Sequence, residues 1–258
     1  MNGWNRTRGP SGPFFYAALG AHPEGAGRRA QGRRGAEHDN DRPASGGADI
    51  YRYILASGGA DISAGRPASG PSLLDGKPVV AIATYSDRNT KTGKVLQTYI
   101  IRSDISPLDA SKTGADFSIC GDCKFRGTPT TDPKRKQAVK RDCYVNLGQG
   151  PTIVYKAFLR GRYPIAQAYA GDSFTVDQVQ DLGRGRIVRL GTYGDPAAIP
   201  SSIWDRLISR AESHLAYTHQ SGFRPDIAMQ SADTKAQAVA HWNNGRRTFR
   251  VITDLGDI

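Results

Sequence analysis

The chain has 258 residues, of which 38% are hydrophobic and 30 are glycine, and its formal net charge is +11. This length allows one large domain or two small ones. No apolar run approaches the roughly 20 residues that span a bilayer. The short apolar stretch over residues 14–19 lacks the basic flank and cleavage site of a signal peptide. These features argue against integral membrane and exported proteins, so we expect a soluble, cytoplasmic protein.

The basic charge and the cysteine content indicate which partners and which kind of cysteine site are possible. A positive net charge permits binding to a polyanion such as nucleic acid, although it specifies partners weakly and many basic proteins have only a solvated surface. The three cysteines are an odd number, and two of them lie three positions apart. This pattern suits a reducing compartment and a metal or redox role better than a disulfide framework.

Residues 1–70 do not have the pattern of a folded domain. They are rich in Gly, Ala, Pro, Ser and Arg, contain no Lys, and show neither helical nor strand periodicity. The heptapeptide ASGGADI occurs at residues 44–50 and again at 56–62, which is too short and polar a repeat to build a solenoid. We expect this segment to be disordered and the folded domain to cover residues 71–258. A start codon assigned too far upstream is an alternative origin for it.

The first predicted elements of the domain are two strands and a short helix. Residues 78–85 (PVVAIATY) and 95–102 (VLQTYIIR) are β-rich runs of strand length, and their polar link predicts a hairpin or a long loop. Residues 106–114 (SPLDASKTG) predict a short helix with proline in its first turn and glycine at its end. An irregular, cysteine-bearing loop over residues 119–146 follows.

The second half of the chain alternates helices and strands. The predicted helices are 150–161, 201–211 and 234–242, the last two capped by Ser201 and Asp233; the predicted strands are 186–191, 214–219, 226–230 and 248–253. This alternation predicts an α/β fold with βαβ units around a mostly parallel sheet or a partial barrel. Only residues 220–225 separate two of the strands, whereas a parallel crossover usually needs about a dozen residues. That pair is therefore either a hairpin or an irregular crossover.

The cysteines form the first candidate site. Cys120 and Cys123 lie in a Cys-Gly-Asp-Cys turn, which brings two thiolates toward one ion, and Cys143 returns after a loop of 19 residues. Three thiolates supply three of the four tetrahedral positions of zinc, and a histidine or water could supply the fourth. We therefore predict a zinc or iron–sulfur site at Cys120, Cys123 and Cys143.

Two alternatives to that metal site stay open. Lys124, Arg126 and Arg141 lie near the thiols in sequence and would favour the thiolate form electrostatically, as metal binding and redox chemistry both require. A redox-active dithiol is therefore one alternative. Three ordinary reduced cysteines in a structural loop are the other.

The second candidate site lies where the predicted strands end. Asp195 and His219 each follow a strand, and the carboxyl ends of parallel strands meet at one edge of a sheet. We expect these two residues to lie close together as catalytic acid–base groups or as metal ligands. Asp233 follows a third strand. A purely structural role is the alternative, because Asp195 can begin the turn before Pro196 and Asp233 can cap a helix.

Several segments together resemble a known protein family. The series TGADFSICGDCKFRG, CYVNLGQGP, VRLGTYGDPAAIPSSIWDRL, AYTHQ and FRVITD is similar to an uncharacterised family carried by bacteriophages and plasmids, over about residues 72–258. The Cys-Gly-Asp-Cys and Gly-Asp-Pro blocks are its most specific parts. Members of that family continue past the last strand into a second cysteine-rich tail, so the resemblance implies a truncated or frame-shifted gene.

A more distant resemblance concerns the fold. The segments VRLGTYGD and AYTH are similar to another phage family with cysteine-rich blocks, which implies a radical-enzyme-like partial barrel. The Cys-x-x-x-Cys-x-x-Cys pattern of radical enzymes is absent, so their chemistry is not implied.

Two functional hypotheses follow from the sequence. The first is a mobile-element protein with a cysteine-bound metal or iron–sulfur site that works in nucleic-acid metabolism or replication. The second is a non-catalytic DNA- or RNA-binding accessory protein that uses its basic surface. A gene product without activity is a third reading.

Overall fold

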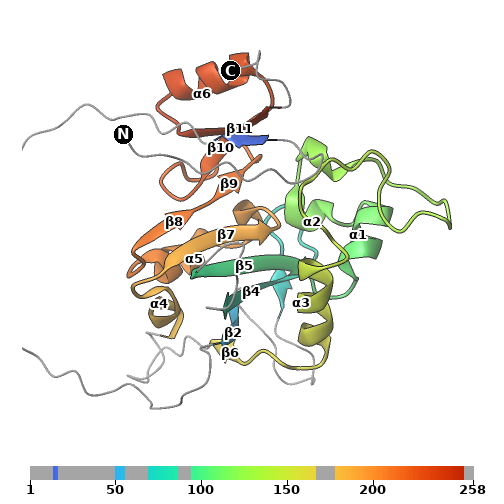
Figure 1. Cartoon of the computed structure of the whole chain (residues 1–258), viewed down its shortest axis with the longest axis horizontal. Coiled ribbons are helices and arrows are strands. Elements are labelled where there is room, and N and C mark those ends of the chain that lie inside the picture. The colour runs from blue at the N-terminus through green and yellow to red at the C-terminus, as the bar shows by residue number, and fades with distance from the viewer. Residues whose placement is uncertain (1–13, 17–49, 56–68, 87–93, 167–177, 253–258) are drawn as a thin grey trace, which may run out of the picture.

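The fold contains two β-sheets with helices packed around them (Figure 1). The structure is a computed structural model and describes residues 14–16, 50–55, 69–86, 94–166 and 178–252. The seven-stranded sheet has the spatial order β6 (Ile165–Ala166), β2 (Ile50–Leu55), β4 (Pro78–Ser86), β5 (Val95–Arg102), β7 (Ile187–Tyr193) and β8 (Ser213–Leu215), and β3 (Gly70–Pro71) pairs with β4. The four-stranded sheet has the order β1 (Phe14–Tyr16), β11 (Thr248–Ile252), β10 (Met229–Ala232) and β9 (Tyr217–Thr218).

Short helices connect these strands. In chain order they are α1 (Pro107–Thr113), α2 (Phe117–Cys120), η2 (Lys124–Arg126), α3 (Gly150–Leu159), α4 (Gln178–Gly183), η3 (Pro196–Ala198), α5 (Ser201–Ile208) and α6 (Lys235–Asn243). The α1 helix follows the predicted signals, since the Ser106 side chain accepts a hydrogen bond from the Asp109 N–H at 3.1 Å and Gly114 is the C-cap. No helix in the described ranges is long and apolar enough to cross a membrane.

The strand pairing confirms an α/β fold with a mixed sheet. β4 and β5 pair in antiparallel orientation, as the hairpin prediction requires. β7 pairs in parallel with both β5 and β8, and the chain passes through α5 between β7 and β8. In the smaller sheet β10 pairs in parallel with β9 and β11, so the short connection after residue 219 is an irregular crossover and not a hairpin.

The structure differs from the expectation of disorder for two stretches before residue 70. β1 pairs in antiparallel orientation with β11 of the smaller sheet. β2 pairs with β4 over six residues, and Leu55 at its end is fully buried. Apart from Arg52, the residues of β2 (IYRYIL) are β-branched, aromatic or aliphatic, and therefore favour a sheet locally. The average composition of residues 1–70 concealed this short run. Most of that segment, including most of the duplicated heptapeptide, lies outside the described residues.

Three local predictions in the second half need correction. The single strand predicted over 214–219 is two strands, because β8 joins the larger sheet and β9 joins the smaller one. Thr234, not Asp233, caps α6, since its side chain accepts a hydrogen bond from the Gln237 N–H at 3.2 Å. Ser201 is the first residue of α5 and makes no capping hydrogen bond; Pro200 occupies the cap position.

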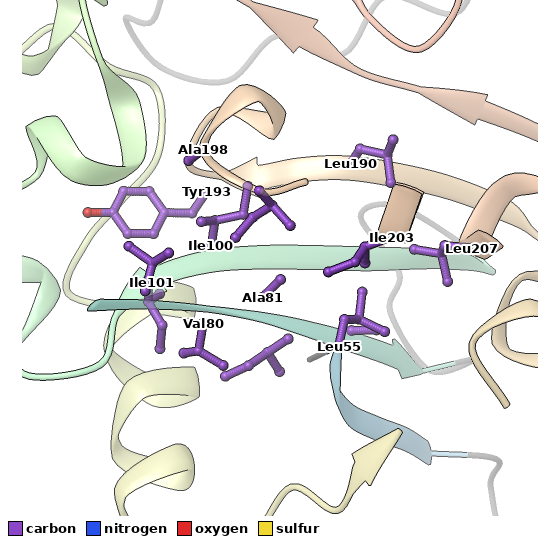
Figure 2. Packing of buried hydrophobic residues seen from close by; sticks show 14 of the residues in the cluster. Leu55, Val80, Ala81, Ile100, Ile101, Leu190, Tyr193, Ala198, Ile203 and Leu207 are labelled. Carbon is purple, nitrogen blue, oxygen red and sulfur yellow. The ribbon is translucent and has the colours of Figure 1, made fainter. Parts of the chain in front are cut away.

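The hydrophobic core lies between the larger sheet and the helices that pack on it, which include α3 as well as the helices that follow β7. Leu55 of β2 belongs to the same cluster as Ile203 and Leu207 of α5 (Figure 2). Trp204 of α5 is also fully buried, and its indole N–H donates to the Pro196 carbonyl oxygen at 2.8 Å. The core therefore fixes η3 and the end of β7, where the candidate site begins.

We predict that Leu55→Ala lowers the free energy of unfolding by about 2–5 kcal/mol, because it leaves a cavity in the core. The matched control is Leu73→Ala, whose side chain is 61% exposed and should cost less than about 1 kcal/mol. Urea denaturation of the full-length variants measures both values. Equal, small effects would contradict the placement of β2 in the sheet.

Candidate functional site

The candidate site forms where β7, β9 and β10 end and the cysteine-bearing loop packs against them. Asp195 follows β7, His219 follows β9 and Asp233 follows β10. The His219 N–H donates to Asp195 Oδ2 at 2.9 Å, so these two residues lie close together as predicted. The expected reason is wrong, because β7 and β9 belong to different sheets and not to one parallel sheet. The contact uses the His219 backbone, and the imidazole remains available for other partners.

Asp195 is a buried carboxylate with a full set of partners. Its Oδ1 accepts hydrogen bonds from the Thr218 hydroxyl at 2.8 Å and from the Ala197 N–H at 3.0 Å. Burial raises the pKa of Asp195, although its three hydrogen bonds and the nearby His219 oppose that rise. Asp195 also caps η3, so the structural role considered from the sequence is realised. Its geometry is that of a residue that positions its neighbours.

The His219 imidazole faces Asp233. Nε2 lies 3.8 Å from Asp233 Oδ1, and both atoms are buried without a hydrogen-bond partner among the described residues. The Phe125 ring packs edge-on against the imidazole, with ring centroids 5.8 Å apart. Burial lowers the pKa of His219, while Asp233 and Asp195 act in the opposite direction. The neutral imidazole can therefore accept a proton or ligate a metal at neutral pH.

Lys124 completes this group from the cysteine-bearing loop. Its Nζ lies 3.2 Å from Asp233 Oδ1, as an ion pair without hydrogen-bond geometry, and 5.1 Å from the centroid of the Phe125 ring. Because Thr234 caps α6, the Asp233 carboxylate is free to take part in this contact. A carboxylate, an imidazole and an ammonium group thus meet at the edge of the smaller sheet.

The three cysteines are free thiols, and each is half-buried. Cys120 ends α2, Cys123 precedes η2, and the Cys143 N–H donates to the Phe125 carbonyl oxygen at 3.0 Å, which returns Cys143 to the vicinity of the turn. Burial raises the pKa of Cys120 strongly and that of Cys123 to about 12, and the neighbouring thiols add to both shifts. Within the described residues, no group of three or more His, Cys, Asp or Glu side chains is arranged to hold a metal ion.

The basic residues near the thiols do not have the effect expected from the sequence. Arg126 donates to Asp116 Oδ1 at 2.7 Å and to the carbonyl oxygens of Gly114 and Gly121, each at 2.9 Å. Arg141 donates in the same way to the carbonyl oxygens of residues 143 and 145. The hydrogen bonds of these two arginines hold the loop in place. Burial therefore has the largest effect on the thiol pKa values, and Cys120 and Cys123 are protonated at neutral pH.

Backbone contacts close the loop between Cys123 and Cys143. The Thr128 N–H donates to the Val139 carbonyl oxygen at 2.8 Å, and the Val139 N–H donates back at 2.9 Å. The loop has few core-forming residues, so hydrophobic packing alone does not hold its ends together. The antiparallel bridge and the guanidinium contacts provide that closure instead.

Gln220 is a site residue that sequence reasoning missed. Its side-chain amide donates to the Cys120 carbonyl oxygen at 3.2 Å and so fastens the cysteine turn to the end of β9. A Cβ at Gly121, whose φ is +55°, would lie 2.4 Å from the Gln220 side chain. The contact joins residues 100 positions apart and has no local signal in the sequence.

The chain matches no protein-family model, no curated protein and no solved structure. The phage and plasmid resemblance therefore stays a prediction.

We predict that the His219 pKa lies below about 6.5, the ordinary value for histidine. Asp233→Asn should lower this pKa further, because it removes a stabilising negative charge, and Lys124→Gln should raise it, because it removes a positive one. Titration of the imidazole protons by NMR measures both shifts. The folded-state pKa of His219 lies below its unfolded-state pKa, so the neutral imidazole contributes to the stability of the fold. This contribution is complete above about pH 6.5 and is lost as the pH falls through the folded-state pKa. If both variants shift the His219 pKa in the same direction, the placement of Asp233 and Lys124 around the imidazole is wrong.

Proposed function

We propose that this chain binds nucleic acid, with the exposed cations of the loop between Cys123 and Cys143 as its main contact surface. The observation that carries the proposal is the state of Lys134, Arg135, Lys136 and Lys140. All four are exposed, and none forms an ion pair with a carboxylate in the described part of the chain. Several other cations, such as Arg102 and Arg224, are paired with aspartates.

The loop presents these cations on a defined base. The Thr128–Val139 bridge lies between the cysteine turn and the basic residues, and the loop extends beyond α1 at the periphery of the molecule (Figure 1). Phosphate groups are bound by lysine and arginine with the release of condensed counterions, which gives sequence-independent affinity. A net charge of +11 adds long-range attraction to this local surface.

We predict that the triple variant Lys134→Gln, Arg135→Gln, Lys136→Gln weakens binding to duplex DNA by about tenfold near 0.1 M salt. The slope of log affinity against log salt concentration should become shallower by up to about 3, since each phosphate contact contributes about 0.9. Fluorescence anisotropy over a range of salt concentrations measures both quantities.

The matched control for the basic loop removes three exposed cations elsewhere. Lys156→Gln, Arg160→Gln, Arg162→Gln changes the net charge equally, in and after α3. It should reduce the affinity by less than about threefold, through net charge alone. If both triple variants weaken binding equally, the loop has no special role. If the wild-type chain does not bind duplex DNA, the proposal is wrong.

The approach of His219 Nε2 to Asp233 Oδ1 favours a second candidate function, a metal site. Imidazole nitrogen, carboxylate oxygen and the nearby thiol groups are the donor types that zinc prefers, and thiolates are also the ligands of iron–sulfur clusters. Cys120, Cys123 and Cys143 would be the sulfur ligands, after a rearrangement of the described side chains, which are not arranged around an ion as they stand. Bound zinc would act as a Lewis acid. The raised thiol pKa values mean that binding must displace protons.

The remaining sequence-based expectations belong to the same proposal. His219 would serve as the proton acceptor in any acid–base chemistry at this edge, with Asp195 holding its backbone in place. A mobile-element origin, a role in replication and a partial barrel of βαβ units are further expectations from the sequence.

For the metal site we predict that anaerobically purified protein contains zinc or iron, measured by elemental analysis and by the visible spectrum. Cys123→Ser and His219→Gln should each lower the metal content at least about tenfold in buffered titrations. His214→Gln is the control, since His214 Nε2 lies 3.2 Å from the Asp226 carbonyl oxygen, away from this edge. Metal affinity should fall as the pH decreases, because the thiols must lose protons. Unchanged metal content in Cys123→Ser would count against this site.

A further inference from the structure

Arg189 on β7 carries a charge that no carboxylate among the described residues neutralises. Its Nη2 donates to the Tyr144 hydroxyl at 2.6 Å, and its guanidinium carbon lies 5.6 Å from the centroid of the Tyr144 ring. Its Nε is buried and has no hydrogen-bond partner in the described ranges. A half-buried guanidinium with a tyrosine as its side-chain partner is set up to receive an anion.

The surroundings of Arg189 are aromatic. Arg189 pairs with Gln97 on β5 and with Leu215 on β8, and two tyrosines follow these residues in sequence, Tyr99 on β5 and Tyr217 on β9. The charge of Arg189 acts on both of them, which places them near the guanidinium. Burial raises the pKa of both tyrosines, and the charge of Arg189 opposes this effect in each case. The Tyr217 ring in turn packs against Phe249, with centroids 4.0 Å apart.

Tyr144 is the accessible member of this cluster. It is 47% exposed and directly follows Cys143, at the end of the basic loop. Exposed tyrosine rings stack on nucleobases with little sequence preference. A guanidinium beside such a ring can bind a phosphate through paired N–H groups while the ring holds the base.

A second arginine on the same segment of chain shows the contrast. The guanidinium carbon of Arg186 lies 4.9 Å from the centroid of the Tyr85 ring, but its Nη1 donates to the carbonyl oxygens of Asp181 at 3.3 Å and Leu182 at 2.8 Å. The guanidinium of Arg186 is thus satisfied by the protein backbone. Arg189 has no comparable set of acceptors within the described ranges.

We propose that Arg189, Tyr144 and Tyr217 form a nucleotide site, with the phosphate on the guanidinium and the base on the exposed Tyr144 ring. The ligand is either a free nucleotide or a nucleotide unit within a single strand. In the second case the inference rests on the proposed nucleic-acid function, because the strand would run from the basic loop to this site. In the first case it is independent of that function.

The test uses the full-length protein and two probes. Thymidine monophosphate is titrated by calorimetry, and a fluorescent oligothymidylate of about 12 nucleotides is titrated by anisotropy. Arg189→Gln should weaken binding of the responding probe by about tenfold, and Tyr144→Ala by about fivefold to tenfold. Tyr144→Phe keeps the ring and should stay within about threefold of the wild type. Circular dichroism and thermal unfolding confirm that each variant is folded.

Arg186→Gln is the matched control, because it removes the same charge from an arginine that also packs on a tyrosine. It should change the affinity by less than about twofold. A response to thymidine monophosphate that requires Arg189 identifies a free-nucleotide site, and a response to the oligonucleotide alone identifies a single-strand site.

Two results would overturn the inference: equal weakening by Arg189→Gln and Arg186→Gln, or no binding of either probe by the wild type. If duplex DNA binds through the basic loop while Arg189→Gln has no effect on either probe, the nucleotide site is wrong and the proposed function stands. If Arg189→Gln weakens binding of a probe and the triple variant of the basic loop does not weaken binding of duplex DNA, the nucleotide site stands and the proposed function is wrong.

Discussion

The Asp195 carboxylate is the junction on which the arrangement of the candidate site depends. It follows β7 of the larger sheet and accepts hydrogen bonds from Thr218, the last residue of β9 in the smaller sheet, and from His219, which follows it. Its backbone N–H donates to the Ile119 carbonyl oxygen at 2.6 Å, which ties the cysteine-bearing loop to the same point. A buried carboxylate is costly to desolvate, so its acceptors must all be matched by donors. Thr218, His219 and the Ala197 N–H at the start of η3 supply those donors, while the Ile119 carbonyl oxygen of the loop accepts from the Asp195 N–H. These contacts hold the smaller sheet and the loop in register with the end of β7.

Burial, and not formal charge, controls the chemistry of the cysteine loop. The sequence places three basic residues near the thiols, and that proximity predicts thiolates. In the folded chain Arg126 and Arg141 donate to backbone carbonyl oxygens and to Asp116, and Lys124 pairs with Asp233. Their charges stabilise the loop geometry, while the thiols lie half-buried beside one another. A metal or an oxidant would therefore meet protonated sulfur, and its binding would be coupled to proton release.

Local signals were sufficient for much of the fold. The 95–102 strand and the 107–113 helix lie within one or two residues of their predicted limits, because β-branched runs, an N-terminal proline and a C-terminal glycine act over short distances. The strand predicted over 214–219 looked continuous, yet its two halves pair with different sheets. The segment divides into two strands because β8 pairs with β7 and β9 pairs with β10, and these pairings are not visible in the local sequence. β2 was missed for a related reason, since a short apolar run inside a polar segment gains stability only from its neighbour β4.

The proximity of Asp195 and His219 was predicted from the sequence, but the reason given for it does not hold. The rule of parallel strand ends applies within one sheet, whereas Asp195 follows β7 of the larger sheet and His219 follows β9 of the smaller one. The contacts of Lys124, Gln220 and Arg189 likewise join residues far apart in the chain. No periodicity or spacing marks such contacts. They arise from how the cysteine loop and the sheet pack together, which the sequence specifies only through the whole fold.

The Gly-Asp-Pro block at residues 194–196 shows how closely this packing constrains the site. Gly194 has a φ of +87°, and a Cβ there would lie 2.7 Å from Ile100 Cβ and 3.3 Å from the Ile119 carbonyl oxygen. The Asp195 N–H donates to that same carbonyl oxygen. Pro196 begins η3, and the Pro196 carbonyl oxygen accepts a hydrogen bond from the Trp204 indole in the core. A side chain at residue 194 would thus separate the core, the cysteine loop and the Asp195 junction at once. The three residues of this block have distinct physical roles, namely close approach, hydrogen bonding and helix initiation, and together they transmit the rigidity of the core to the edge where His219 and Asp233 face each other.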